Sequence, residues 1–440
     1  MDKNNGAIYD ARKLGKPKMI ILGVQHMFAM FGATILVPIL TGLDISTTLL
    51  MAGLGTLLFH CITKFKVPAF LGSSFAFLGG YAAIKAFSPN DPNSMLPYAC
   101  LGVACAGLIY FILAAVIKAV GIEKVMRFFP PVVTGPIIIA IGLGLAPSAV
   151  SNCTTNWFLA VVALAVIVVF NIWGKGMAKI IPIILGLLIS YGTGLVLYFI
   201  SQANPDLIQN VPWLFSGGAD ANGVYQPIFD FTSLNTICDN ISKGHIFGSE
   251  GLIGIPIHWD KTVFGGIDYS NGALIASSII AIVPIAFATM MEHIGDICAI
   301  SSTTGNNYIK DPGLHRTLVG DGLATTLASL FGGPANTTYG ENTGVLALTR
   351  VYDPRVIRIA AYFAVAVSFF PIVSVIIGSI PSCIIGGISF VLYGMISAIG
   401  VRNVVENKVD FTKSRNLIVA AVILVLSLIH ISEPTRHSLI

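Results

Sequence analysis

Charged residues are scarce in this chain. Of its 440 residues, 10% are Asp, Glu, Lys or Arg, whereas soluble domains carry about 25%. Hydrophobic residues make up 55% of the sequence, and the apolar runs recur at the length that spans a bilayer. This composition excludes an ordinary soluble domain, and the net charge of +4 gives no indication of nucleic-acid binding. The sequence predicts an all-α protein that crosses the membrane many times.

Cysteine and histidine are also few. The seven Cys and eight His are scattered along the chain, without the pairwise spacing that a metal site needs. The sequence shows no pair of nucleophile and base of the kind that an active site requires. We therefore expect no metal and no cofactor, and predict that the protein is not an enzyme.

The apolar segments form two groups on either side of a long polar stretch. Basic residues cluster at alternate segment ends, which marks those ends as cytoplasmic. Residues 1–17 are therefore predicted to be a cytoplasmic N-terminus, and residues 201–269 an extracytoplasmic loop. The segments are expected at about residues 19–40, 47–63, 70–87, 97–120, 132–149, 157–173, 181–200, 271–294, 317–331, 342–348, 357–377, 383–400 and 416–429.

Two regions contain residues that interrupt a membrane helix. In FGGPANTTYGENTGV, residues 331–345, three of the first four residues are Gly or Pro. A weaker break, VPAFLGSSFAFLGG, covers residues 67–80. Each reads as a run of small residues, a short extended piece with an aromatic residue, and a short helix. Backbone groups freed inside a bilayer need protein or a watery cavity around them. Paired breaks indicate an inverted-repeat transporter with its site near the membrane midplane.

Acidic residues within the apolar segments mark the candidate site. Glu341 lies in the second break, and Glu292 and Asp296 are four residues apart, so they share one helix face. A carboxylate within the membrane is a functional candidate by default. The alternative for Asp296 is a snorkelling interfacial residue. His293 points off that face, which suits plain packing, and Asp321 reads as an acid at the cytoplasmic end of the next segment.

Longer motifs carry a family resemblance. They are QHMFAMFGATILVPILTG, PAFLGSSFAF, EHIGD, KDPGLHRTLVGDGLATTLASLFGGPANTTYGENTGVLALTRVY and GGISFVLYG. Over about residues 17–429 they resemble the nucleobase-ascorbate transporter family, closest to its bacterial uracil permeases. The resemblance implies fourteen segments in two inverted repeats of seven, with the fourteenth missing here. It also implies a core domain that binds substrate, residues 18–120 and 270–378, and a gate domain that slides against it, residues 121–200 and 379–429.

The resemblance implies three sets of site residues. The substrate-binding set is Phe75, Glu292, Tyr339, Gly340 and Glu341. The supporting set is His26, Asn342 and Tyr393, with His26 acting through Asn342. Proton coupling would involve Asp296, Glu292 and Glu341.

One of two departures from the family pattern bears on the substrate. Asp296 stands where the uracil permeases have His, as it does in purine-transporting members. Glu341 follows the uracil branch, since purine members tend to carry Gln there, and the wider TTYGENTGV match favours uracil. The chain end departs as well, because the last apolar run stops at Ile429 and passes into a polar tail. Residues 430–440 are interpreted as foreign or frame-shifted sequence.

The chemistry of a pyrimidine fits these residues. Its edge alternates N–H donors with carbonyl acceptors, so a pocket needs carboxylates that accept and backbone N–H groups that donate. Glu292 and Glu341 supply the carboxylates, and short helices that begin at the two breaks supply the N–H groups. Two carboxylates in a desolvated pocket raise each other's proton affinity, so one of them can carry a proton across.

The sequence thus predicts a bacterial inner-membrane importer of a nucleobase, uracil first, by proton symport with alternating access. A xanthine or purine permease of the same family is the alternative. An anion carrier on the same fold is disfavoured, because an anion site should not hold two acids. Sodium as the coupling ion and a homodimeric assembly are left open.

Overall fold

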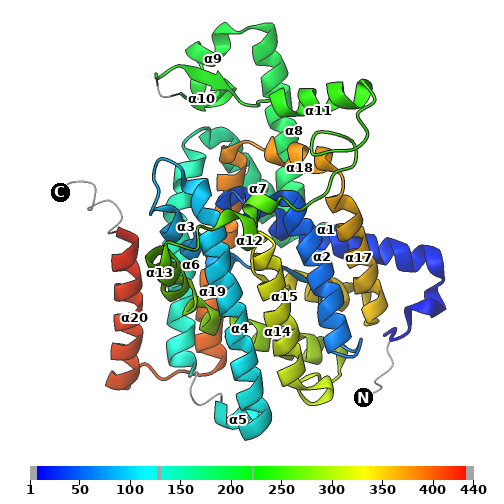
Figure 1. Ribbon diagram of the computed structural model, residues 1–440, viewed down its shortest axis with the longest axis vertical. Coiled ribbons are helices and arrows are strands. Elements are labelled where there is room, and N and C mark those ends of the chain that lie inside the picture. The colour runs from blue at the N-terminus through cyan, green and yellow to red at the C-terminus, as the bar shows by residue number, and fades with distance from the viewer. Residues whose placement is uncertain (1–6, 126–129, 180, 221, 433–440) are drawn as a thin grey trace. The chain divides into compact units, whose positions relative to one another are not determined.

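The computed structural model describes residues 7–125, 130–179, 181–220 and 222–432, with the backbone alone for residues 123, 341 and 426–432 (Figure 1). Most of these residues are helical, because only a helix satisfies the backbone within a single membrane-embedded segment. The helices are α1 (Lys16–Thr41), α2 (Ile45–Ile62), α3 (Leu78–Lys85), α4 (Leu96–Val120), α5 (Ile122–Val125), α6 (Pro131–Cys153), α7 (Trp157–Trp173), α8 (Pro182–Ala203), α9 (Asp206–Asn210), α10 (Pro212–Phe215), α11 (Thr232–Ser242), α12 (Val263–Gly266), α13 (Gly272–Ile282), α14 (Ile285–Thr304), α15 (Leu314–Leu330), α16 (Gly340–Thr349), α17 (Pro354–Ser368), α18 (Pro371–Gly378), α19 (Ser382–Glu406) and α20 (Ser414–Ser432). The strands are β1 (Leu71–Ser73), β2 (Ser216–Ala219), β3 (Tyr225–Pro227) and β4 (Asn336–Thr338).

The membrane-spanning character of the chain is plain in the helix lengths. Within the described residues, seven helical stretches are long and apolar enough to cross a membrane, or eight if one bent pair is counted as a span. That bent pair overturns one predicted segment. Residues 357–377 were expected to be continuous, but α17 and α18 meet at an angle of 87°. Pro371 begins α18, and proline has no N–H with which to continue the ladder of α17.

The chain divides into two compact units. Unit 1 comprises Met1–Val120, Gly174–Ile184 and Phe231–Ser379, and unit 2 comprises Gly121–Trp173, Leu185–Asp230 and Ile380–Ile440. The predicted extracytoplasmic loop, residues 201–269, is shared between them, since the division falls at Asp230. Core and gate roles for these parts of the chain stay predictions.

Unit 1 is built around close helix pairs. α15 packs against α4 and α2, and α17 packs against α2 and α1 (Figure 1). At the α4–α15 crossing, a Cβ on Gly107 would lie 2.7 Å from the carbonyl oxygen of Gly322, and one on Gly322 would lie 2.6 Å from that of Gly107. No side chain fits at such distances, so glycine allows the two backbones to touch, as small residues do between membrane helices.

The two predicted breaks meet at the centre of unit 1. β1 pairs with β4 in antiparallel register, with Leu71 opposite Thr338 and Ser73 opposite Asn336. The flanking bonds, Ser74 N to Ala335 O at 2.9 Å and Tyr339 N to Phe70 O at 3.0 Å, continue the pairing. Each strand is followed by a short helix, α3 or α16. This confirms the prediction of two broken helices that contain extended segments, and shows how backbone groups opened within the membrane are satisfied.

The N-terminal segment, residues 7–15, is held against one end of unit 1. Ile8 N donates to the carbonyl of Arg350 at 2.8 Å and its carbonyl accepts from Tyr352 N at 2.8 Å. Ala11 N donates to the buried Asp353 carboxylate at 2.7 Å, and the Tyr9 hydroxyl donates to the carbonyl of Thr304 at 2.7 Å. The segment therefore joins the end of α14 to the loop that follows α16.

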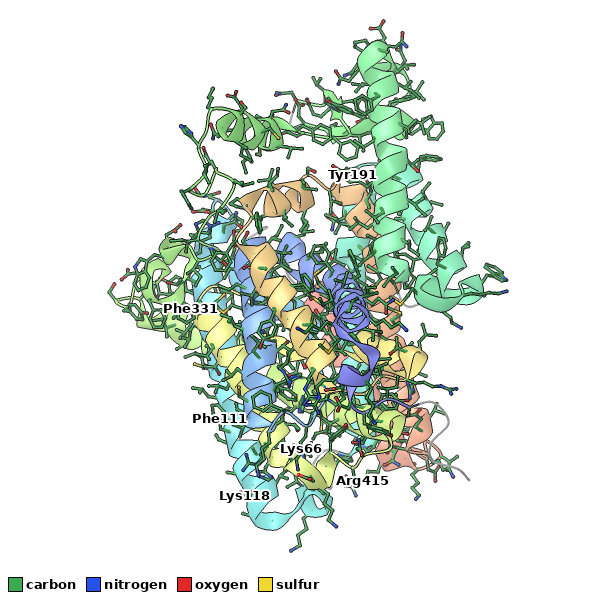
Figure 2. All side chains as sticks on the ribbon, turned by 90° about the vertical axis from the view of Figure 1, so that its right-hand side faces the viewer. Lys66, Phe111, Lys118, Tyr191, Phe331 and Arg415 are labelled. Atoms are coloured by element: carbon green, nitrogen blue, oxygen red, sulfur yellow. The ribbon has the colours of Figure 1, made fainter. Side chains whose placement is uncertain are left out.

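Basic residues gather at one end of unit 1. Figure 2 shows Lys66 and Lys118 together at that end, with Phe331 farther away from it. Lys66 forms an ion pair with Asp311 at 2.6 Å in the connection between α14 and α15. The assignment of this end to the cytoplasm stays a prediction.

Unit 2 is organised by the packing of α19 against α6 and α7, with α20 on α6. Glycines again allow the contact: a Cβ on Gly400 would lie 2.7 Å from the Gly135 carbonyl oxygen. Helix α20 continues to Ser432, so the apolar run expected to end at Ile429 is helical slightly beyond it. Most of the predicted foreign tail, residues 433–440, lies outside the described residues.

Candidate functional site

Helix α14 carries the acidic cluster that the sequence singled out. Glu292 is exposed and Asp296, one turn further along, is half-buried. Their four-residue spacing places both carboxylates on one side of the helix. His293 lies on another side and is fully buried. The helix thus separates two accessible acids from a buried imidazole.

The N-terminus of α16 faces Asp296. The helix begins at Gly340 after Tyr339, and Asp296 Oδ1 lies 3.8 Å from the position that a Cβ on Gly340 would occupy. The first N–H groups of a helix have no partner within it, and its dipole favours a negative charge there. Glu341 is the second residue of α16, and its side chain lies outside the described part of the structure. This arrangement brings backbone donors and the carboxylate of Asp296 to one place.

Thr338 connects β4 to the acids of α14. Its hydroxyl donates to Asp296 Oδ2 at 2.8 Å and lies 3.3 Å from His293 Nδ1. The backbone of Thr338 is fixed by its pairing with Leu71 of β1. The position of Asp296 therefore depends on the crossing of the two broken helices.

Tyr339 stabilises the crossing of β1 and β4 by hydrogen bonds to residues of β1 and α1. Its hydroxyl donates to the carbonyl of Ser73 at 2.9 Å and accepts from Thr34 Oγ1 at 3.2 Å. Its ring covers Gly72, where a Cβ would lie 2.5 Å from the ring. Phe75 is half-buried and packs against the same core cluster as Tyr339. Tyr339 therefore stabilises the fold at the crossing, and substrate contact by Phe75 and Tyr339 stays a prediction.

His26 and Asn342 contact each other inside unit 1. Asn342 Nδ2 lies 3.2 Å from His26 Nδ1 and 3.2 Å from its carbonyl oxygen, and both side chains are buried. Because the amide donates, the imidazole accepts on Nδ1 and carries its proton on Nε2. The pair ties α1 to the first turn of α16. Tyr393 is buried in α19 of unit 2, and its supporting role stays a prediction.

The structure changes the interpretation of His293 and Asp321. The sequence predicts Asp321 at a cytoplasmic helix end, but the structure buries it completely within α15. Its Oδ2 lies 3.5 Å from His293 Nδ1 and accepts from Thr337 Oγ1 at 3.5 Å. The sequence feature that could have indicated this burial is an acid among the small residues of GDGLATT, because small residues allow helices to pack closely. His293 thus has two polar neighbours, Thr338 and Asp321, and whether it serves function or packing stays a prediction.

Among the described residues, no group of three His, Cys, Asp or Glu side chains is placed to hold a metal ion. A cavity of about 330 Å³ opens at the far end of α14, lined by Cys298, Ser301, Ser302, Gly305, Asn306, Asn307 and Ile309. Cys298, Ser301 and Ser302 lie beyond Asp296 on α14, and the other lining residues follow the end of that helix.

Paired broken helices, a two-stranded crossing and carboxylates beside it define a polytopic membrane transporter of the inverted-repeat type. A solved structure of the transmembrane domain of the cyanobacterial bicarbonate transporter BicA has the same fold, with a TM-score of 0.65 over 97% of this chain and 98% of that one, at 14% identity. The overall structure of SLC26A9 matches with a TM-score of 0.51 at 10% identity, covering 96% of this chain and 62% of that one. At these identities the likeness shows the fold alone.

The family follows from the sequence comparisons. Residues 17–435 match the model of the Permease family, and the chain belongs to this family. A uracil permease of Bacillus caldolyticus is 39% identical over 93% of this chain and 84% of its own length. A uracil permease of Bacillus subtilis (38%; 92% of this chain, 84% of its own) and a putative pyrimidine permease of Escherichia coli (36%; 96% and 85%) are similar. The prediction of a multi-pass transporter rather than an enzyme is confirmed.

Proposed function

We propose that this protein imports a nucleobase, uracil first, by proton symport with alternating access. The observation that carries the proposal is the meeting of Asp296 with the N-terminus of α16 at the β1–β4 crossing, with Glu292 one turn away on α14. The high identity to permeases named for uracil over nearly the whole chain supports the choice of substrate.

The geometry suits a planar ring with alternating donors and acceptors. Glu292 is an exposed acceptor on α14, and the N–H groups that begin α16 at Gly340 are donors. A uracil edge can present its N–H group to the Glu292 carboxylate and its carbonyl group to the N–H groups that begin α16. Phe75 and the peptide of Gly340 supply flat and narrow surfaces against which the ring can lie.

Proton coupling fits a site that holds more than one carboxylate. Glu292 and Asp296 lie one helical turn apart, and like charges at that separation disfavour simultaneous ionisation. A proton bound together with the substrate removes one of these charges, so the loaded site can reorient with less charge inside the membrane. The apparent proton affinity then belongs to the cluster and not to one residue.

Two alternatives differ in substrate. Asp296, in place of the His of the uracil permeases, favours a xanthine or purine permease of the same family. An anion carrier has the support of the fold seen in the bicarbonate transporter, but a pocket with two acids repels an anion. We place the protein in a bacterial inner membrane with a cytoplasmic N-terminus, because the basic residues cluster as that orientation requires.

A competition assay separates these substrates. Purified protein is incubated with labelled uracil, and unlabelled uracil, xanthine or bicarbonate is added at increasing concentration. We expect uracil to displace the label at least tenfold more effectively than xanthine, and bicarbonate to have no effect. Stronger displacement by xanthine would establish the purine alternative, and displacement by bicarbonate would overturn a nucleobase site.

A further inference from the structure

A chain of polar side chains leads from Asp296 into the interior of unit 1. Thr338 Oγ1 is 2.8 Å from Asp296 Oδ2 and 3.3 Å from His293 Nδ1, which is 3.5 Å from Asp321 Oδ2. Asp296 is half-buried, whereas Thr338, His293 and Asp321 are at most 2% exposed. The chain therefore connects an accessible carboxylate to an inaccessible one.

The hydrogen positions along this chain follow from the donors available. While Asp296 is ionised, Thr338 gives its hydroxyl proton to Asp296. Once Asp296 is protonated, it can donate to Thr338 Oγ1, and the Thr338 hydroxyl can donate to His293 Nδ1. Nδ1 is then an acceptor, and the neutral imidazole carries its proton on Nε2.

The buried His293–Asp321 pair lowers the free energy of unfolding relative to an apolar contact at the same place. Asp321 Oδ1 and His293 Nε2 are buried and have no hydrogen-bond partner in the described part of the chain. A buried polar atom left unpaired loses the hydrogen bonds that it makes with water in the unfolded chain. Apolar side chains of similar volume would join α14 to α15 without that loss.

The groups that surround the pair do not replace its internal contacts. Phe59 of α2 directs its ring toward His293, with centroids 6.2 Å apart. The hydroxyl of Tyr110 on α4 donates to Thr289 at 2.7 Å. The other ionisable side chains of α14, α15, α2 and α4 include Glu292, His60, His315, Arg316 and Lys118, and α16 carries Glu341.

We propose that Asp321 is an internal proton acceptor, filled from Asp296 through Thr338 and His293; this rests on the proposed proton symport. The O–H bond of protonated Asp296 breaks as Thr338 Oγ1 takes the proton, and the hydroxyl proton of Thr338 passes to the free Nδ1 of His293, which becomes an imidazolium. The Nδ1–H bond then breaks as the O–H bond of Asp321 forms. One proton leaves Asp296 and one arrives on Asp321, while His293 and Thr338 end with the protons they had.

The consequence is a separation of two roles. Substrate contacts depend on the accessible acids, and the proton can be held out of reach of water on Asp321 while the site changes sides. Asp321 and His293 act through Asp296 and Thr338, so their loss should uncouple transport without abolishing binding.

The test compares two variants at one position. Thr338→Val keeps the shape of the side chain and its β-propensity but removes the hydroxyl, whereas Thr338→Ser keeps the hydroxyl. Each purified variant is reconstituted into liposomes, and three quantities are measured: equilibrium uracil binding, exchange of labelled uracil at equal pH on both sides, and accumulation driven by a pH gradient. Asp321→Asn is measured in the same way.

Asp321→Asn is expected to bind uracil within about threefold of the parent and to exchange it, but to accumulate at least tenfold less. Thr338→Val should lose accumulation at least tenfold more than it loses binding or exchange. Thr338→Ser should accumulate as the parent does. Equal accumulation by Thr338→Val and Thr338→Ser would overturn the relay, and so would a parallel loss of binding and exchange, which would show a structural role. A parent that exchanges uracil but ignores the pH gradient would instead refute the proton symport.

Discussion

Replacing Gly340 by Ala tests the site without disturbing the fold. The added methyl group meets nothing nearer than Asp296 Oδ1 at 3.8 Å, an ordinary van der Waals distance. Gly340 is not among the glycines with a positive φ, so alanine can adopt its backbone conformation, and alanine at such a position stabilises the folded state by about 0.4 to 1 kcal/mol because it reduces the conformational entropy of the unfolded chain. We therefore expect the thermal stability of the variant to equal or exceed that of the parent.

The affinity for uracil, unlike the thermal stability, should fall when Gly340 is replaced by Ala. The methyl group would stand between the first N–H groups of α16 and the carboxylate of Asp296, where we place the substrate edge. Loss of one backbone hydrogen bond removes about 0.5 to 1.5 kcal/mol, which corresponds to about a twofold to tenfold weaker Kd. The control is Gly344→Ala, one turn further along α16, where a Cβ meets nothing within 4 Å.

The assay is equilibrium binding of labelled uracil to the purified parent and both variants, with thermal unfolding measured on the same samples. Gly344→Ala should bind as the parent does and Gly340→Ala should bind more weakly. If Gly340→Ala binds uracil with unchanged affinity, the substrate does not approach the N-terminus of α16 and the reasoning fails.

The remaining predictions address the second acid, the orientation and the N-terminal segment. Glu341→Gln should weaken uracil binding by about tenfold to a hundredfold, since it removes a charge-assisted hydrogen bond worth roughly 1.5 to 3 kcal/mol; unchanged affinity would remove Glu341 from the site. A Cys placed at Asn222, with the exposed Cys238 changed to Ser, should react with an impermeant maleimide in intact cells, and reaction only after permeabilisation would reverse the topology. Asp353→Ala should lower stability by about 1 to 3 kcal/mol, because Asp353 caps α17 and accepts from Ala11 N; an unchanged unfolding midpoint would show that the N-terminal segment is not anchored there.

The broken helices could be predicted because their chemistry is local. FGGPANTTYG combines helix-breaking residues with polar side chains, and a chain inside a bilayer has few ways to satisfy such a stretch. Their pairing as β1 and β4 was not available from either segment alone, since it depends on two regions that lie far apart in the sequence. The bend at Phe370 was missed because apolar residues continue through it, although Pro371 marks the place.

Individual site residues were harder to interpret than the fold. Glu292 and Asp296 stand out as acids in an apolar segment, and their four-residue spacing gives a shared face directly. Asp321 lies close to basic residues in the sequence, which suggested a helix end, whereas tertiary packing against α4 and α14 buries it completely. Burial of this kind depends on neighbouring helices and has no local signature in a segment rich in Gly, Ala and Thr.

Uptake by proteoliposomes tests the central claim most directly. The purified protein is reconstituted, and labelled uracil is supplied outside with the external pH one unit below the internal pH, with and without a protonophore. Proton-coupled import predicts that uracil rises inside above its external concentration, and that the protonophore abolishes this accumulation while exchange continues. Uracil that only equilibrates across the membrane, or accumulates equally well with the protonophore present, would contradict the account.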